Sequence, residues 1–259
     1  MKDVAYSSDG IPVSYEAHGS GEPALVFVHG WSCDRRYWRR QVEHFAGQHR
    51  VVAVDLAGHG ESGGGRPAWT MPAFGDDVVA VTEWLQLRKT VLIGHSMGGD
   101  VVVEAGLRLP DRAIGLVWVD TYSSLGAPRD PDEIARFMAP FREDFAATTR
   151  EFVRGMFVPG SDARVVEWVA AGMSAAPPEI AVDALEHAIS NDRAMPALLR
   201  ELRMPVWAIN PDHRPTDIDG LRRHGVNAVL MAGVGHFLML EDPDGFNRVL
   251  GEVVEDLEG

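Results

Sequence analysis

The apolar residues of the chain follow two alternating patterns. Short, mostly apolar runs are typical of strands buried on both faces of a sheet, and they occupy residues 24–28, 51–56, 91–93 and 115–120. Between these runs, apolar residues recur at the spacing of one helix face, at residues 35–45, 74–85 and 100–109. This alternation predicts right-handed crossovers and a parallel sheet covered by helices on both faces. At the N-terminus, an Asp-Gly turn between residues 4–6 and 11–16 predicts a β-hairpin.

The alternation stops in the middle of the chain. From residue 122 to about residue 199 the sequence shows only helical segments rich in Phe, Met and Ala. The earlier strand and helix patterns then return at residues 204–209, 228–231 and 243–257. We therefore predict an α/β core, residues 1–121 and 201–259, that carries an inserted helical cap of residues 122–200.

Composition narrows the class of protein. The 259 residues are 46% apolar and 24% charged, which suits a globular α/β domain with a large core. The formal net charge of -14 argues against nucleic-acid partners and against binding to anionic membranes, since both need a basic surface. Cys33 is the only cysteine, so neither a disulfide within the chain nor a cysteine-based zinc site is expected. The N-terminus lacks an apolar signal segment, and a cytoplasmic protein with no membrane span is expected.

One short motif carries candidate chemistry. The sequence Gly94-His-Ser96-Met-Gly98 has the pattern G-x-S-x-G and lies between a predicted strand and a predicted helix. The pentapeptide alone is a weak signal, because 27 residues are glycine. In the order strand, sharp turn, helix it indicates a nucleophile elbow, in which a serine is held on a strained backbone ahead of a helix N-terminus. Ser96 is therefore the candidate nucleophile.

Four motifs together resemble the α/β-hydrolase superfamily. They are His29-Gly-Trp31, Asp55-Leu-Ala-Gly-His-Gly-Glu-Ser62, Gly94-His-Ser-Met-Gly-Gly99 and Gly233-Val-Gly-His236. The resemblance covers essentially the whole chain, with the cap as its least specific part. It implies an α/β-hydrolase fold, with a mostly parallel eight-stranded sheet, helices on both faces and an inserted helical cap. It also implies chemistry that needs no cofactor.

The base that a serine nucleophile requires is predicted to be His236. This histidine follows a predicted strand and precedes the last helix. It matches the family's chain order of nucleophile, acid, histidine.

The acid departs from the family pattern. The aspartate position that is usual after the strand at residues 204–209 is occupied by Arg214, and arginine is only a donor. Two candidates stay open: Asp212, which otherwise forms an Asx turn, and Asp120, which otherwise bonds local backbone at a strand end. Asp217 is a third, weaker candidate.

The oxyanion donors are expected from the backbone. The N–H groups of Trp31 and Met97 follow His29-Gly30 and the nucleophile respectively, and main-chain donors are fixed before reaction. Cys33 lies near this loop without a histidine partner and is interpreted as a small buried hydrophobe. The apolar residues of the predicted cap indicate an apolar entrance, and they are Phe137, Met138, Phe141, Phe145, Phe152, Met156, Phe157 and Met173.

These observations predict a serine hydrolase that cleaves small, apolar carboxylic esters or lactones through an acyl-enzyme on Ser96. No cofactor or metal is expected, because the sequence has no H-E-x-x-H, no cysteine pair and no phosphate loop. The enzymatic alternatives use the same triad for C–C bond hydrolysis, perhydrolysis or acyl transfer. An alternative of another class is a small-molecule receptor with residual hydrolase activity.

Overall fold

A computed structural model of the protein describes residues 2–126 and 129–259, so two residues of the predicted cap, 127 and 128, lie outside it. Eight strands form one sheet in the order β1-β2-β4-β3-β5-β6-β7-β8. The strands are β1 Lys2–Tyr6, β2 Pro12–His18, β3 Ala24–Val28, β4 Val51–Val54, β5 Thr90–His95, β6 Ala113–Val119, β7 Val206–Pro211 and β8 Val226–Met231.

The sheet has a short antiparallel edge and a long parallel part. The predicted hairpin is confirmed, because β1 pairs with β2 antiparallel and the Gly10 N–H donates to the Ser7 carbonyl in the turn. β2 is also antiparallel to β4. All further pairs, from β4 and β3 through to β7 and β8, are parallel. The predicted mostly parallel sheet of eight strands is therefore confirmed.

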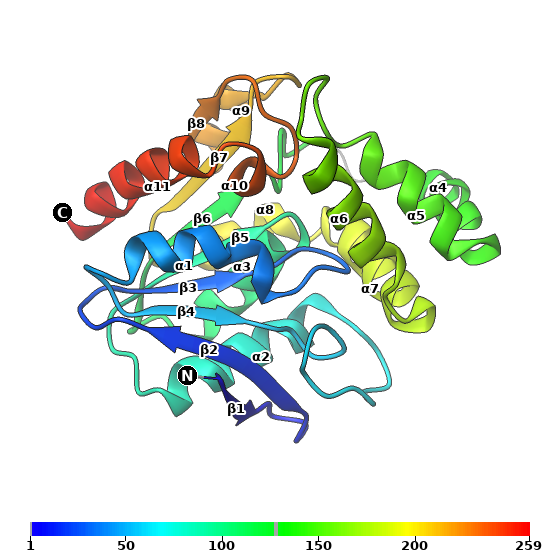
Figure 1. The fold of residues 1–259 in the computed structure, drawn as a ribbon. Coiled ribbons are helices and arrows are strands. Elements are labelled where there is room, and N and C mark those ends of the chain that lie inside the picture. The colour runs from blue at the N-terminus through cyan, green and yellow to red at the C-terminus, as the bar shows by residue number, and fades with distance from the viewer. Residues whose placement is uncertain (1, 127–128) are drawn as a thin grey trace.

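Helices cover both faces of the sheet (Figure 1). On one face, α1 Arg39–Phe45 packs against α11 Pro243–Glu258. On the other face, α2 Met71–Trp84 packs against α3 Met97–Arg108. The single helix predicted at residues 35–45 begins as a 3₁₀ turn, η1 Arg35–Trp38, and the Asp34 side chain caps the Arg36 N–H at its start. The short helices α9 Ile218–Arg223 and α10 Leu238–Glu241 complete the core.

Among the described residues, five helices lie between β6 and β7. They are α4 Pro131–Glu143, α5 Phe145–Arg154, α6 Ala163–Ser174, α7 Pro178–Asn191 and α8 Met195–Glu201. Figure 1 shows α4 to α7, here called the helical insertion, projecting together at one side of the sheet, away from the C-terminus. α8 packs against α3 of the core, as α7 also does, although residues up to 200 belong to the predicted cap.

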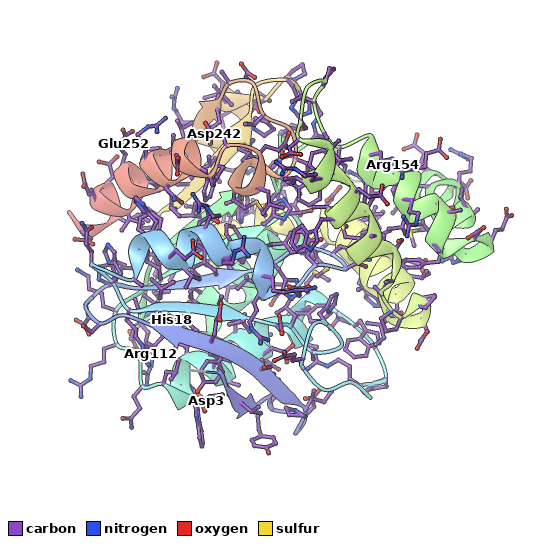
Figure 2. The ribbon with its side chains drawn as sticks, in the orientation of Figure 1. Asp3, His18, Arg112, Arg154, Asp242 and Glu252 are labelled. Atoms are coloured by element: carbon purple, nitrogen blue, oxygen red, sulfur yellow. The ribbon has the colours of Figure 1, made fainter. Side chains whose placement is uncertain are left out.

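The polar residues divide between the surface and a few buried sites. Charged side chains such as Asp3, Arg154 and Glu252 project from the outer surface (Figure 2). Two pairs of buried charges lie close together: Arg35 contacts Asp55, and Arg66 Nη2 lies 2.6 Å from Asp77 Oδ1. Both pairs lie beside the loop after β4 and fix its path, since an unpaired buried charge is costly. None of the helices described is long and apolar enough to cross a bilayer.

Candidate active site

Ser96 occupies a sharp turn between β5 and α3. Its backbone has φ 52° and ψ -121°, a region that side-chain-bearing residues rarely adopt. The turn is so tight that a Cβ at Gly94 would collide with the Gly98 carbonyl, and one at Gly98 would lie 2.6 Å from the His29 carbonyl oxygen. Ser96 is the N-cap residue of α3, yet its side chain makes no capping hydrogen bond. The predicted strand–turn–helix context is present, and the hydroxyl remains available to a ligand.

His236 and Asp120 meet although 116 residues separate them in the chain. His236 Nδ1 donates to Asp120 Oδ2 over 2.6 Å, and both residues are buried. This bond fixes the neutral ring with its proton on Nδ1, so Nε2 is left as the acceptor nitrogen. Asp120 directly follows β6 and has a φ of 46°, which turns its side chain toward the histidine loop.

Arg214 contacts the same carboxylate oxygen as His236. Its Nη2 lies 2.6 Å from Asp120 Oδ2. Burial alone would raise the pKa of Asp120, but the hydrogen bond from His236 and the positive charge of Arg214 lower it by more. The pKa of Asp120 therefore lies below its usual range, and the carboxylate is ionised at neutral pH.

The other two candidate acids lie elsewhere. Asp212 Oδ1 accepts a hydrogen bond of 3.2 Å from the Gly233 N–H. Asp217 caps the start of α9 by accepting from the Gly220 N–H and pairs with Arg223. Within the described part of the chain, neither is hydrogen-bonded to His236. The structure thus brings Asp120, of the two acids left open by the sequence, to the histidine.

The loop that carries His236 is held from three directions. Glu241 Oε1 accepts from the Gly235 N–H at 3.0 Å and from the Phe237 N–H at 3.2 Å. The His236 N–H itself donates to the Met156 carbonyl at the end of α5. These bonds fix the backbone on both sides of the imidazole. Glu241 was not identified from the sequence, where a carboxylate at the start of a helix gives no sign of its partners.

His95, next to Ser96 in the chain, forms the third support. Its Nε2 donates to the His236 carbonyl over 2.9 Å, and the two imidazole rings lie 4.6 Å apart. The sequence assigned no role to this residue because it is the variable position of the elbow. The contact ties the elbow directly to the histidine loop.

Two backbone N–H groups close to Ser96 in the fold have no hydrogen-bond partner among the described residues. The Trp31 N–H and the Met97 N–H form no hydrogen bond within the described residues, and Trp31, Ser96 and Met97 line one cavity. The close approach of Gly30 allows this, since a Cβ there would lie 3.1 Å from Ser96 Cβ. Unpaired donors beside a hydroxyl suit the stabilisation of an oxyanion.

The cavity above Ser96 has a volume of about 190 Å³. Ser96, Met97 and His236 lie along it, and its walls are largely apolar. Four of the eight apolar cap residues named from the sequence line it: Phe137, Phe152, Met156 and Met173. Of the other four, Phe141 and Phe145 pack against Trp31, Phe157 stacks on Phe237, and Met138 is buried. Cys33 also lines the cavity as a buried side chain, and burial raises the pKa of its thiol well above the usual value.

Two other observations bear on the kind of site. A larger groove of about 1190 Å³ lies between η1 and α6, but neither Ser96 nor His236 lines it. Among the described residues, no group of three or more His, Cys, Asp or Glu side chains is arranged to hold a metal ion.

A mostly parallel eight-stranded sheet, with a serine on a strand–helix turn and a histidine in a late loop, is the arrangement of the α/β-hydrolase class. The model of the Alpha/beta hydrolase family matches residues 25–249. The chain therefore belongs to this family, as the four sequence motifs predicted.

Individual relatives agree with this assignment. The pimeloyl-[acyl-carrier protein] methyl ester esterase of Edwardsiella ictaluri is 31% identical over 140 residues, which cover 52% of each chain. The 3-oxoadipate enol-lactonase 2 of Acinetobacter baylyi is 25% identical over 98% of this chain and 97% of its own. A solved structure of a thermophilic esterase from Thermogutta terrifontis superposes with a TM-score of 0.85, 24% identity and full coverage of both chains.

Proposed function

We propose that this protein is a serine hydrolase that cleaves small carboxylic esters or lactones. The observation that carries the proposal is the bond from His236 Nδ1 to Asp120 Oδ2, beside a serine hydroxyl that lines the same cavity as the histidine. The printed activities of the relatives, a methyl ester esterase and an enol-lactonase, support the same class of reaction.

In the first half of the proposed reaction, Ser96 Oγ attacks the carbonyl carbon and its proton passes to His236 Nε2. Asp120 holds the imidazole in the required tautomer and stabilises the imidazolium. The oxyanion receives hydrogen bonds from the N–H groups of Trp31 and Met97. The bond between the acyl carbon and the alcohol oxygen then breaks, and the proton on Nε2 goes to the leaving alkoxide.

In the second half, a water molecule attacks the acyl-enzyme and gives its proton to His236 Nε2. The second tetrahedral oxyanion uses the same two backbone donors. When the bond to Ser96 Oγ breaks, the proton returns to the serine and the carboxylic acid leaves. For a lactone, the alcohol and the acid are the two ends of one product.

The helical insertion is proposed to act as the cap of this site. Its side chains Phe137, Phe152 and Met173 line the cavity, and they exclude water from the reacting carbonyl. Three hydrogen bonds attach α7 to the core within the described residues, one of them from Asn191 Nδ2 to Asp100 Oδ1 over 2.8 Å. The Trp31 Nε1–H donates to the Ala181 carbonyl over 2.7 Å, and the Trp69 N–H donates to Asp183 over 2.7 Å.

A fluorophosphonate probe tests the nucleophile. We expect intact-mass analysis to show one adduct on the unaltered protein and none on Ser96→Ala. A panel of p-nitrophenyl acetate and butyrate, lactones and a C–C hydrolase substrate, with Ser96→Ala as the blank, then identifies the reaction. Absence of both the adduct and any turnover above the blank would refute the proposal, and binding with very slow turnover would favour the receptor.

A further inference from the structure

One end of the active-site cavity is polar. Asp100, Tyr122, Arg129 and Asp192 line it there, and the proposed mechanism uses none of them. Asp100 lies in the first turn of α3, four residues after Ser96, and therefore on the same side of the helix. Four residues of helix correspond to a rise of about 6 Å. The polar end thus lies within reach of a substrate whose carbonyl is at Ser96.

Asp100 has one oxygen that is saturated and one that is open. Oδ1 accepts from the Tyr122 hydroxyl at 2.6 Å and from Asn191 Nδ2 at 2.8 Å. Oδ2 receives no hydrogen bond from the described residues. It is also not completely enclosed by protein atoms, whereas the unpaired His95 Nδ1 is. The residue as a whole is 4% exposed. Oδ2 is therefore a buried acceptor that faces the cavity.

The surrounding charges favour a donor over another carboxylate. Burial, together with the nearby carboxylates of Asp192 and Glu104, raises the pKa of Asp100 to about 7, so about half of it is ionised at neutral pH. The positively charged side chain at this end of the cavity is Arg129, and it already forms an ion pair with Asp192 at 3.3 Å. A substrate carboxylate would meet two acidic groups here and lose its hydration, whereas an O–H or N–H group would find a free acceptor.

We propose that the polar end is a subsite for a hydroxyl or ammonium group of the substrate, which donates to Asp100 Oδ2. The spacing to Ser96 corresponds to an extended chain of about five bonds from the reacting carbonyl. This inference rests on the proposed function, because it places the ester at Ser96. It assigns a substrate class, esters with a distal hydrogen-bond donor, which neither the fold nor the family specifies.

Asp100 also ties the insertion to the core through Asn191, and the test must separate that structural contact from ligand binding. Asp100→Asn keeps the size of the side chain and an Oδ1 acceptor for Tyr122 and Asn191. It replaces the open acceptor with an NH₂ donor. Glu186→Gln is the matched control, since it also replaces a carboxylate by an amide, does not line the cavity, and has its Oε2 bound to Arg142.

Binding is measured on Ser96→Ala, so that no ester is consumed, by calorimetry or ligand-observed NMR. The acyl series is methyl heptanoate, methyl 6-hydroxyhexanoate, methyl 6-aminohexanoate and monomethyl adipate. The alcohol series is butyl butyrate and 3-hydroxypropyl butyrate. In at least one series, we expect the preference for the donor-bearing ester over its alkyl match to fall about tenfold with Asp100→Asn. The control Glu186→Gln should keep the preference, and binding of monomethyl adipate should improve with Asp100→Asn.

The two donor classes are separated by pH, without a variant at Asp100. Between pH 6 and pH 8, the affinity for the amino ester relative to methyl heptanoate should rise as Asp100 ionises, if ammonium is the ligand group. A flat ratio assigns the hydroxyl instead, provided that the hydroxy ester shows the Asp100 dependence. Equal preferences in Ser96→Ala with and without Asp100→Asn, in both series, would overturn the subsite. Because these affinities do not depend on turnover, a failure of hydrolysis by the unaltered protein would count against the proposed function alone.

Discussion

Asp120 receives two donors on a single oxygen. His236 Nδ1 and Arg214 Nη2 each lie 2.6 Å from Oδ2. Arg214 stands where the family usually has its acid, and its guanidinium reaches the carboxylate that we propose in that role. The side chain of Arg214 is 56% exposed, so water screens its contribution. The bond to His236 is therefore the one on which the orientation of the imidazole depends.

Asp120→Asn is expected to lower kcat by about three to four orders of magnitude, because the imidazole loses the acceptor that holds its tautomer. Asp212→Asn, at the other acid left open by the sequence, should change kcat less than about threefold, since Asp212 bonds only the Gly233 turn. Steady-state kinetics with p-nitrophenyl butyrate measures both, and thermal melting confirms that each variant is folded. A large loss in Asp212→Asn with little in Asp120→Asn would reverse the assignment.

The histidine loop is the element on which the site depends. It has no regular secondary structure of its own between β8 and α10, so its shape comes from Glu241, Met156 and His95. Glu241 also accepts from the Ser161 hydroxyl at 2.6 Å through its other oxygen. One carboxylate thereby joins the loop to the segment between α5 and α6.

Glu241→Ala is expected to lower kcat by about 10- to 100-fold with little change in KM, because two loop N–H groups lose their acceptor and the imidazole shifts. Glu241→Gln keeps an Oε1 acceptor and should remain within about threefold of the unaltered protein. The rate of fluorophosphonate labelling at Ser96 should follow kcat in both variants. Equal losses in the Ala and Gln variants would mean that the charge of Glu241, rather than its bonds to the loop, matters.

The same elements show which features local patterns can predict. Continuous apolar runs identified β3 to within a residue, and G-x-S-x-G placed Ser96 on its turn, because both depend on neighbours in the chain. α9 and α10 were not predicted, since six and four residues are too short to show a helical period. The choice between Asp120 and Asp212 depends on where β6 lies relative to β8 in the folded sheet. No periodicity in the sequence carries that information.

At the scale of the whole molecule, several buried groups titrate abnormally. Burial lowers the pKa of His29 to about 4 and the pKa values of His59 and His95 to about 3. Between pH 6.5 and about 4, the unfolded chain therefore binds protons at these histidines that the fold does not. Their contribution to stability is lost as the pH falls through this window. The pKa of Asp100 has the opposite effect on stability. Because this pKa is about 7, the folded state keeps a proton between pH 3.8 and about 7 that the unfolded state releases, so acidification through this range favours the fold.

We expect Asp100→Asn to lose stability more steeply than the unaltered protein when the pH falls from 7 to 4.5. The variant lacks the group whose proton uptake favours the fold on acidification. The difference in slope should reach at most about 1.4 kcal/mol per pH unit. Urea unfolding across this range measures it, with the exposed Asp256→Asn as control. Parallel curves for Asp100→Asn and the unaltered protein would show that Asp100 is ionised in the fold throughout.

Trp31 gives the molecule one further property. Its main-chain N–H belongs to the proposed oxyanion pair, while its indole donates to Ala181 and packs edge-on against Phe141 and Phe145. A swing of α7 away from the sheet must either break the indole bond or drag the loop that bears the amide. The site could then not admit a new ester and stabilise the oxyanion at the same time. The proposed active site would therefore be inactive whenever the cap is open.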